Sequence, residues 1–229
     1  MPKRKGGSLM RPLVTLMVLP PFNETYSPCI QASLNAGVSV VGLGSDLNEW
    51  TTCFAGQAFF SLDVHLRSEQ SVMLGLQELK KRFHHIDRLL YVMPPLLTDE
   101  LSQSQSTPSS LHGQTFMDAC GDSFAQVFTV FRELARLMAM QQQGRVLTLM
   151  VNRGEESEAS DLFVQDVRHQ QMQSLNLHLG EEFSVYNVTF NSLSVKLENV
   201  GESFVGEQVH SFLYAPYFAG VTAQHLDLG

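Results

Sequence analysis

The stretch Leu13-Val14-Thr15-Leu16-Met17-Val18-Leu19 decides the fold class of this chain, and Pro20-Pro21 follows it directly. A run that is apolar except for one threonine predicts a strand buried on both faces. The run is too short to span a membrane, and proline ends it. Residues 23–36 then predict a helix that Gly37 closes, and residues 38–41 predict a second strand. A strand, a helix and a strand in this order are typical of a parallel sheet.

The rest of the chain continues this alternation. We expect further strands at 58–64, 88–93, 145–151, 184–190 and 221–228, and helices after Ser68, around 116–138 and around 162–179. The sequence therefore predicts an α/β fold, a Rossmann-like doubly wound parallel sheet of about seven strands in a single domain at residues 11–229. A disordered basic tail at residues 1–10 precedes this domain, and residues 97–114, rich in serine and glutamine, predict a polar surface excursion.

Composition and charge exclude several classes of protein. The chain has 229 residues, of which 44% are hydrophobic and 17% charged, so it is neither disordered nor a coiled coil. Its net charge of −8 argues against nucleic acid or a membrane as a partner. The three cysteines and eight histidines have no metal-ligand spacing, so we expect no metal site. An odd number of widely spaced cysteines predicts a reduced, cytoplasmic protein.

Several short motifs occur in an order that resembles a known family. They are Leu62-Asp63-Val64 after the third strand, Ile86-Asp87-Arg88-Leu89-Leu90 at the fourth, Gln143-Gly144-Arg145-Val146 at the fifth, and Phe212-Leu213, Val221-Thr222-Ala223-Gln224 and Leu226-Asp227-Leu228-Gly229 near the end. In this order the chain resembles the short-chain dehydrogenase/reductase family from about residue 11 onward. The resemblance implies a Rossmann fold and a reductase ancestry, although fold alone does not determine function.

The resemblance also implies where a cofactor would bind. The family's first turn carries glycines that let the backbone approach the pyrophosphate of NAD(P). Those glycine positions correspond here to Pro20, Glu24 and Tyr26, and no glycine occurs between Gly7 and Gly37. Met93 occupies a position that normally belongs to the polar cofactor floor. We therefore expect no bound cofactor.

The family's catalytic residues are replaced as well. The positions of its asparagine, serine, tyrosine and lysine correspond to Ser123, Val151, Val164 and Arg168. No tyrosine occurs between Tyr91 and Tyr186, and no lysine between Lys81 and Lys196. Since proton transfer in this family needs the tyrosine and the lysine, the resemblance predicts loss of its catalysis.

Four remaining features receive structural interpretations. Asp63 could contact an adenine-like ring, but we favour a residue that is left from such a contact and now caps a turn. We expect the Gly42-Leu43-Gly44 segment in a loop. Arg168 falls near the family's lysine position and could lie in the corresponding cleft, but it stays charged and is a poor proton shuttle, so we favour a solvated helix face. Cys120 belongs to an apolar helix stripe and predicts a buried structural thiol.

The helices around 115–142 and 162–179 are the predicted subunit interface. Val127, Val130, Leu134 and Leu137 widen the apolar surface of the first one beyond a single stripe. The favoured hypothesis is a non-catalytic family homologue, a pseudoenzyme, that acts as a structural or regulatory subunit. It would form a homo-oligomer or a hetero-oligomer with an active reductase subunit. The alternatives are an oxidoreductase of the same fold and a small-ligand sensor, either one using an atypical site.

Overall fold

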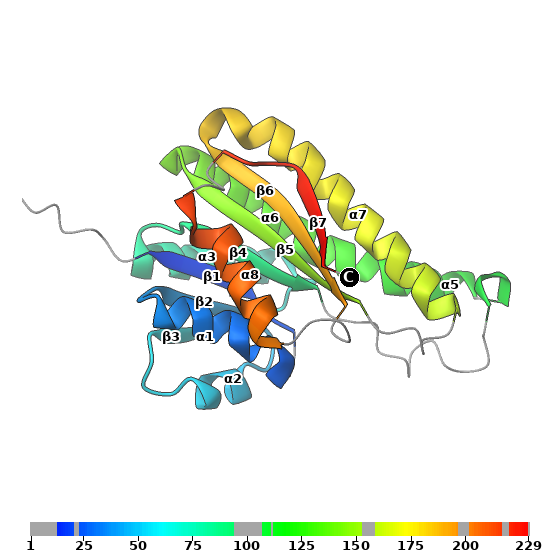
Figure 1. Ribbon diagram of the computed structural model, residues 1–229, viewed down its shortest axis with the longest axis horizontal. Coiled ribbons are helices and arrows are strands. Elements are labelled where there is room, and N and C mark those ends of the chain that lie inside the picture. The colour runs from blue at the N-terminus through cyan, green and yellow to red at the C-terminus, as the bar shows by residue number, and fades with distance from the viewer. Residues whose placement is uncertain are drawn as a thin grey trace, which may run out of the picture.

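The computed structural model describes residues 13–20, 23–93, 107–110, 112–152, 159–196, 202–216 and 220–228. Its centre is one seven-stranded parallel sheet with the order β3-β2-β1-β4-β5-β6-β7 (Figure 1). The strands are β1 (Val14–Val18), β2 (Ser39–Gly44), β3 (Phe59–Asp63), β4 (Arg88–Met93), β5 (Gly144–Asn152), β6 (Val188–Lys196) and β7 (Gln224–Leu228). This is the doubly wound α/β sheet that the sequence predicts.

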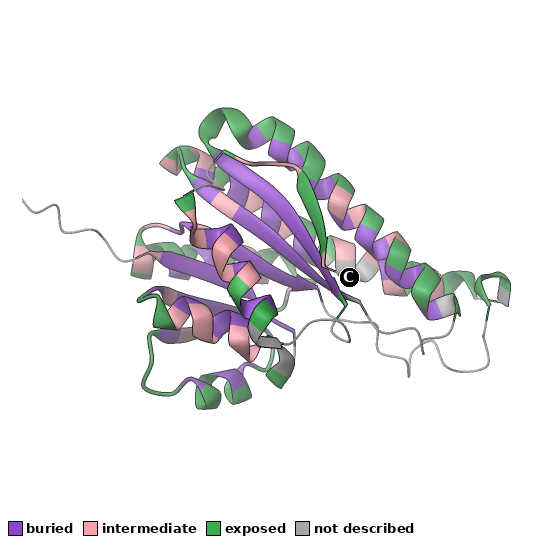
Figure 2. Cartoon of the chain, viewed as in Figure 1, coloured by how far each residue is buried: buried purple, intermediate pink, exposed green. Residues whose placement is uncertain are grey.

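Helices cover both faces of the sheet. The α-helices are α1 (Ser27–Asn35), α2 (Asn48–Cys53), α3 (Glu69–Phe83), α5 (Gly113–Met117), α6 (Ser123–Gln141), α7 (Ala159–Phe183) and α8 (Glu202–Tyr214). One hydrophobic cluster lies between the sheet and α3, α6 and α7, and a second lies between the sheet and α1, α2 and α8. Because both faces are covered, most of the central strands are buried (Figure 2).

Most element boundaries follow the sequence signals. Gly37 has a φ of 74° directly after α1, and the Ser68 hydroxyl accepts a hydrogen bond from the Ser71 amide at the start of α3. The predicted strand at 184–190 is displaced, because residues 184–186 form a 3₁₀ turn and Asn187 takes a φ of 58° before β6 begins. Helix α2 was not predicted, since six residues are too few to show a helical period.

The helix predicted around 116–138 is not continuous. A π-helical turn, Asp118–Asp122, separates α5 from α6 and rotates the two apolar stripes relative to each other. Within α6, Val127, Val130 and Leu134 lie at helical spacing with the buried Phe131 and are buried in the core, whereas Phe128 is 38% exposed. The prediction that the first three widen an interface is wrong, because they face the sheet.

Two predicted segments lie largely outside the described residues. The tail at 1–10 is one, and most of the excursion at 97–114 is the other. Within the excursion, Pro108–Ser110 form the 3₁₀ turn η2, residues 107–109 are exposed, and α5 begins at Gly113.

Candidate functional site

The carboxyl ends of the strands form the edge at which open α/β sheets usually bind ligands. Strand order reverses here between β1 and β4, which both pair with their neighbours in parallel. The positions that the sequence assigned to the cofactor follow these strands. The structure brings them to one edge: Pro20 after β1, Asp63 at the end of β3 and Met93 at the end of β4.

The turn after β1 is packed with protein atoms. Pro20 is buried, and its carbonyl oxygen accepts a hydrogen bond of 3.1 Å from the indole Nε1 of Trp50 in α2. Tyr26 ends the 3₁₀ turn η1 (Glu24–Tyr26), is 3% exposed and belongs to the hydrophobic cluster beneath α1 and α8. Glu24 is exposed. The tyrosine at a family glycine position is thus a core residue here.

The first turn of α1 is also covered. Pro28 lies in this turn and has no amide hydrogen to donate. A Cβ atom placed on Gly206 of α8 would lie 2.8 Å from the Pro28 carbonyl oxygen, so only glycine allows this approach. Tyr26, the residue that precedes α1, provides no side-chain cap to the helix amides. Helix α8 therefore packs closely on the end of α1 that holds phosphate in dinucleotide-binding folds.

Three of the positions assigned to the cofactor floor and the catalytic groups carry apolar, buried side chains. Met93 is 4%, Val151 6% and Val164 0% exposed. Val164 packs in a small cluster with Cys120, Phe116 and Val167, between the π-helical turn and α7. Ser123 is the first residue of α6, directly after the π-helical turn. None of the three buried side chains offers a group that can transfer a proton.

Arg168 differs from its predicted environment. It is 3% exposed, so the prediction of a solvated helix face is wrong. The residue belongs to a set of polar side chains on α7 that are buried: Asp161, Gln165, Arg168, His169 and Asn176. Its positive charge acts to lower the pKa of Tyr91 and Cys120, although burial dominates and raises the pKa of Tyr91 to about 12 and that of Cys120 above its usual range. The prediction rested on the charge of Arg168, whereas α7 buries polar and apolar residues together.

Two glycines also differ from their predicted setting. Gly42 and Gly44 lie within β2, not in a loop. A Cβ on Gly44 would lie 2.8 Å from the carbonyl oxygen of Leu19. The absence of side chains there lets the chain that leaves β1 run close to β2. Asp63 is exposed at the end of β3, opposite Gly44.

A second polar group, which the sequence did not single out, lies between α7 and the last strands. The Ser192 hydroxyl and the His225 Nδ1 are 3.0 Å apart, and their residues are register partners on β6 and β7. On the next strand Thr148 is bonded to the Asn176 side chain of α7. Burial and the charge of Arg168 lower the pKa of His169 to about 4, and burial lowers that of His225. Strand register and the packing of α7 bring these residues together, so their spacing in the sequence could not have identified them.

Among the described residues, no group of three or more His, Cys, Asp or Glu side chains is arranged to hold a metal ion. Among the described helices, none combines the length and the apolar character needed to cross a bilayer.

Comparison with known proteins supports the fold. No protein-family model matches the sequence. A search of curated proteins finds no relative. Among solved structures, one described as a 3-oxoacyl-reductase from Bacillus thuringiensis has a TM-score of 0.73 with 11% sequence identity, over 95% of this chain and 97% of that one. The chain therefore has the single-domain Rossmann-like fold of short-chain dehydrogenase/reductase proteins. At this identity the likeness establishes the fold alone.

Proposed function

We propose that this protein is a non-catalytic homologue of the short-chain dehydrogenases/reductases, which acts as a structural or regulatory subunit. It would act as a homo-oligomer or together with an active reductase subunit, in the cytoplasm. The observation that carries the proposal is the burial of Tyr26 at a position where the family has a glycine beside the pyrophosphate. A side chain that forms part of the core cannot leave without creating a cavity.

The residues of the first turn do not fit NAD(P). A pyrophosphate binds through backbone amides at a helix N-terminus, where the helix dipole favours negative charge. Here Pro28 removes one donor, α8 packs against the same turn at Gly206, and the carboxylate of Glu24 adds charge of the same sign as the ligand. The Trp50 indole holds the Pro20 carbonyl instead of leaving the turn free. We derive no hydride transfer through this site.

The catalytic positions support the same conclusion. General acid–base catalysis needs a group that gains and loses a proton near neutral pH. Val151 and Val164 carry no such group, and the guanidinium of Arg168 stays protonated. Tyr91 is a phenol on which the charge of Arg168 acts, but burial raises its pKa to about 12, away from the range of an acid–base catalyst.

Exposed apolar side chains on α5, α6 and α7 support an interface with another subunit. They are Met117 (61%) on α5, Phe128 (38%) on α6, and Leu162 (37%) and Phe163 (40%) on α7. The rings of Phe163 and Phe116 stack with centroids 5.8 Å apart, so the patch is already ordered across two elements. Exposed apolar patches of this kind usually contact a partner.

A small-ligand sensor is the second candidate function. A cavity of about 340 Å³ opens between α7 and β7, beside the Ser192–His225 pair. Its lining is polar and includes the side chains of Gln170, Gln173 and Asn176. This cavity would bind a neutral polar molecule, because its lining residues carry no permanent charge.

Calorimetric titration of the full chain with NADH and with NADPH tests the main proposal. We expect no heat of binding up to millimolar cofactor, whereas an active reductase of the same fold binds in the same buffer. Binding in the micromolar range would overturn the proposal. An oligomer that requires the apolar patch should be split by Phe163→Asp and kept by Leu74→Asp, a matched change at a residue that is 58% exposed on α3. Sedimentation velocity measures both variants, and a monomeric wild type would contradict the interface.

A further inference from the structure

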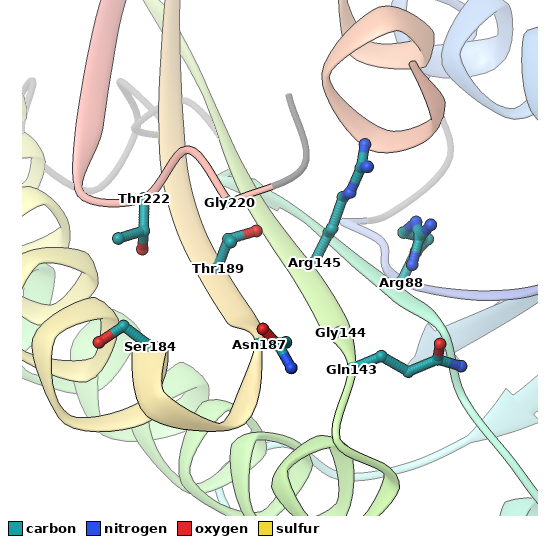
Figure 3. Close-up of a pocket in the computed structure, with 9 residues that line it drawn as sticks. All are labelled: Arg88, Gln143, Gly144, Arg145, Ser184, Asn187, Thr189, Gly220 and Thr222. Carbon is teal, nitrogen blue, oxygen red and sulfur yellow. The ribbon is translucent and has the colours of Figure 1, made fainter. Parts of the chain in front are cut away.

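A polar pocket lies at the opposite edge of the sheet, where β4, β5 and β6 begin (Figure 3). Its volume is about 370 Å³. The pocket is lined by Arg88, Gln143, Gly144, Arg145, Ser184, Asn187, Thr189, Gly220 and Thr222. This lining contains two arginines and no carboxylate, in a chain whose net charge is −8. The pocket is separate from the cofactor positions discussed above, and the inference below does not rest on the proposed function.

Three of the lining residues form a row across the sheet. Arg88 pairs in register with Arg145, and Arg145 pairs with Thr189. Register partners on neighbouring parallel strands project to the same face, so the two guanidinium groups and the hydroxyl lie on the side of the sheet that α8 covers. Like charges directly opposite each other repel, and an arrangement of this kind needs compensation.

The end of α8 compensates the two arginines only in part. Arg88 donates from Nε to the Leu213 carbonyl and from Nη1 to the Asp87 carbonyl, both at 2.7 Å. Arg145 donates from Nη1 alone, to the carbonyls of Phe212, Leu213 and Ala215. Within the described part of the chain, Nε and Nη2 of Arg145 and Nη2 of Arg88 make no hydrogen bond. Capping a helix C-terminus therefore leaves donors of both guanidinium groups unused.

Thr189 provides the independent sign of a ligand. The residue is only 5% exposed, yet its Oγ1 has no hydrogen-bond partner among the described residues. Figure 3 shows this hydroxyl on the side of Thr189 that faces Arg145. A buried hydroxyl without a partner is costly, and such groups are rare in folded proteins. An acceptor between Thr189 and Arg145 would satisfy both.

The charge around the pocket favours an anion. The carboxylate of Asp87, the residue before Arg88, already accepts hydrogen bonds from the Val14 amide and the Gln143 side chain, and His85 lies 3.3 Å from it. Burial lowers the pKa of both arginines. The charge of Asp87 raises the pKa of Arg88, and the charge of Arg88 lowers that of Arg145 further. A negative charge between the two guanidinium groups would raise the pKa of each and reduce their mutual repulsion.

We propose that this pocket binds a phosphate group through Arg145, Arg88 and the Thr189 hydroxyl. Guanidinium groups bind phosphate with two parallel hydrogen bonds, and a hydroxyl supplies a third donor to a further oxygen. The donors of Arg88, Arg145 and Thr189 come from three strands, and a carboxylate offers them only two oxygens, fewer than a phosphate group. The pocket volume exceeds that of the bare ion, so the ligand is inorganic phosphate or a small phosphate monoester.

Calorimetry of the full chain with inorganic phosphate, at constant ionic strength, tests the proposal. We expect saturable binding with a Kd on the order of 1 mM or tighter. Glycerol phosphate and acetate serve as the other two probes. Tighter binding of the monoester assigns the site to a phosphorylated small molecule, and preference for inorganic phosphate assigns it to the free ion. Equal or tighter binding of acetate, or no saturable binding of either phosphate, overturns the proposal.

Two matched substitutions separate the ligand site from fold stability. Thr189→Val removes the unpartnered hydroxyl, so the variant should melt at the same temperature as the wild type or higher, yet bind phosphate about 5-fold or more weakly. Thr148→Val on the opposite face of β5 removes a hydroxyl that is bonded to Asn176, so it should melt lower and keep wild-type phosphate affinity. Arg145→Lys keeps the charge, loses the two-pronged geometry and should also weaken binding. Unchanged phosphate affinity in both Thr189→Val and Arg145→Lys would overturn the proposal.

Discussion

The two edges of the sheet differ in a way that reverses the usual arrangement of this fold. At the carboxyl edge, Tyr26, Met93 and Val151 are buried apolar or aromatic side chains within hydrophobic clusters. At the amino edge, Arg145 and Thr189 face a polar pocket with donors that no described residue satisfies. At these positions the carboxyl edge is part of the core, whereas the amino edge carries polar groups whose hydrogen-bonding capacity the described residues do not fill.

The difference between the two edges does not affect the sheet itself. The strands and their register do not depend on a ligand, because backbone hydrogen bonds and apolar burial stabilise them. Side chains at the strand ends are under no such constraint. At the carboxyl edge, the buried Tyr26 adds apolar contact area to the core.

The largest expected effect comes from removing Tyr26. Tyr26→Ala should lower the free energy of unfolding by about 3–5 kcal/mol, because it leaves a cavity in the core. Urea denaturation followed by circular dichroism measures the loss. Tyr186→Ala is the matched control, since Tyr186 is 41% exposed, and it should change stability by less than about 1 kcal/mol. A stable Tyr26→Ala variant that binds NADH would contradict the view of the carboxyl edge as core.

Lowering the pH should reduce the free energy of unfolding by a smaller amount. The pKa of His169 is about 4 in the folded protein and about 6.5 in the unfolded chain, so the unfolded state binds more protons between these values. This contribution to stability is complete above pH 6.5 and is lost as the pH falls toward 4. The total loss is at most about 3 kcal/mol.

Thermal melts from pH 7.5 to pH 4.5 check this dependence. His169→Gln should flatten the curve in that range, because glutamine does not titrate. His178→Gln is the control, since His178 is exposed on the same helix. Equal acid sensitivity of the wild type and the His169→Gln variant would show that the imidazole stays accessible to protons.

The smallest effect concerns reactivity without loss of stability. Cys53 is exposed, whereas Cys29 and Cys120 are buried. Burial raises the pKa of the Cys29 thiol to about 12 and that of Cys120 above its usual range, so neither forms thiolate near neutral pH. A thiol reagent at pH 7.5 should label one cysteine rapidly, and Cys53→Ser should abolish that labelling. Fast labelling of Cys120 would mean that the π-helical turn exposes the cluster of Cys120 and Val164 to solvent.

The sequence by itself determined the fold. The apolar run at 13–19 predicted β1, and the structure assigns Arg88–Met93 to β4 with the predicted bounds. Gly37 and Ser68 marked helix ends by local geometry. The sequence also shows directly that no glycine occurs between Gly7 and Gly37, no tyrosine between Tyr91 and Tyr186, and no lysine between Lys81 and Lys196. The assignment of particular residues to the family's positions rests on the resemblance.

Only the tertiary structure decided where polar groups lie. The charge of Arg168 favoured a solvated position, but that side chain is buried, and its charge acts on Tyr91 and Cys120. The face of α6 that meets the sheet carries Val127, Val130 and Leu134 rather than Phe128. Arg88, Arg145 and Thr189 are far apart in sequence and meet only through the strand register. Local sequence encodes backbone periodicity, whereas register and helix packing, which depend on the whole chain, determine which polar side chains come together.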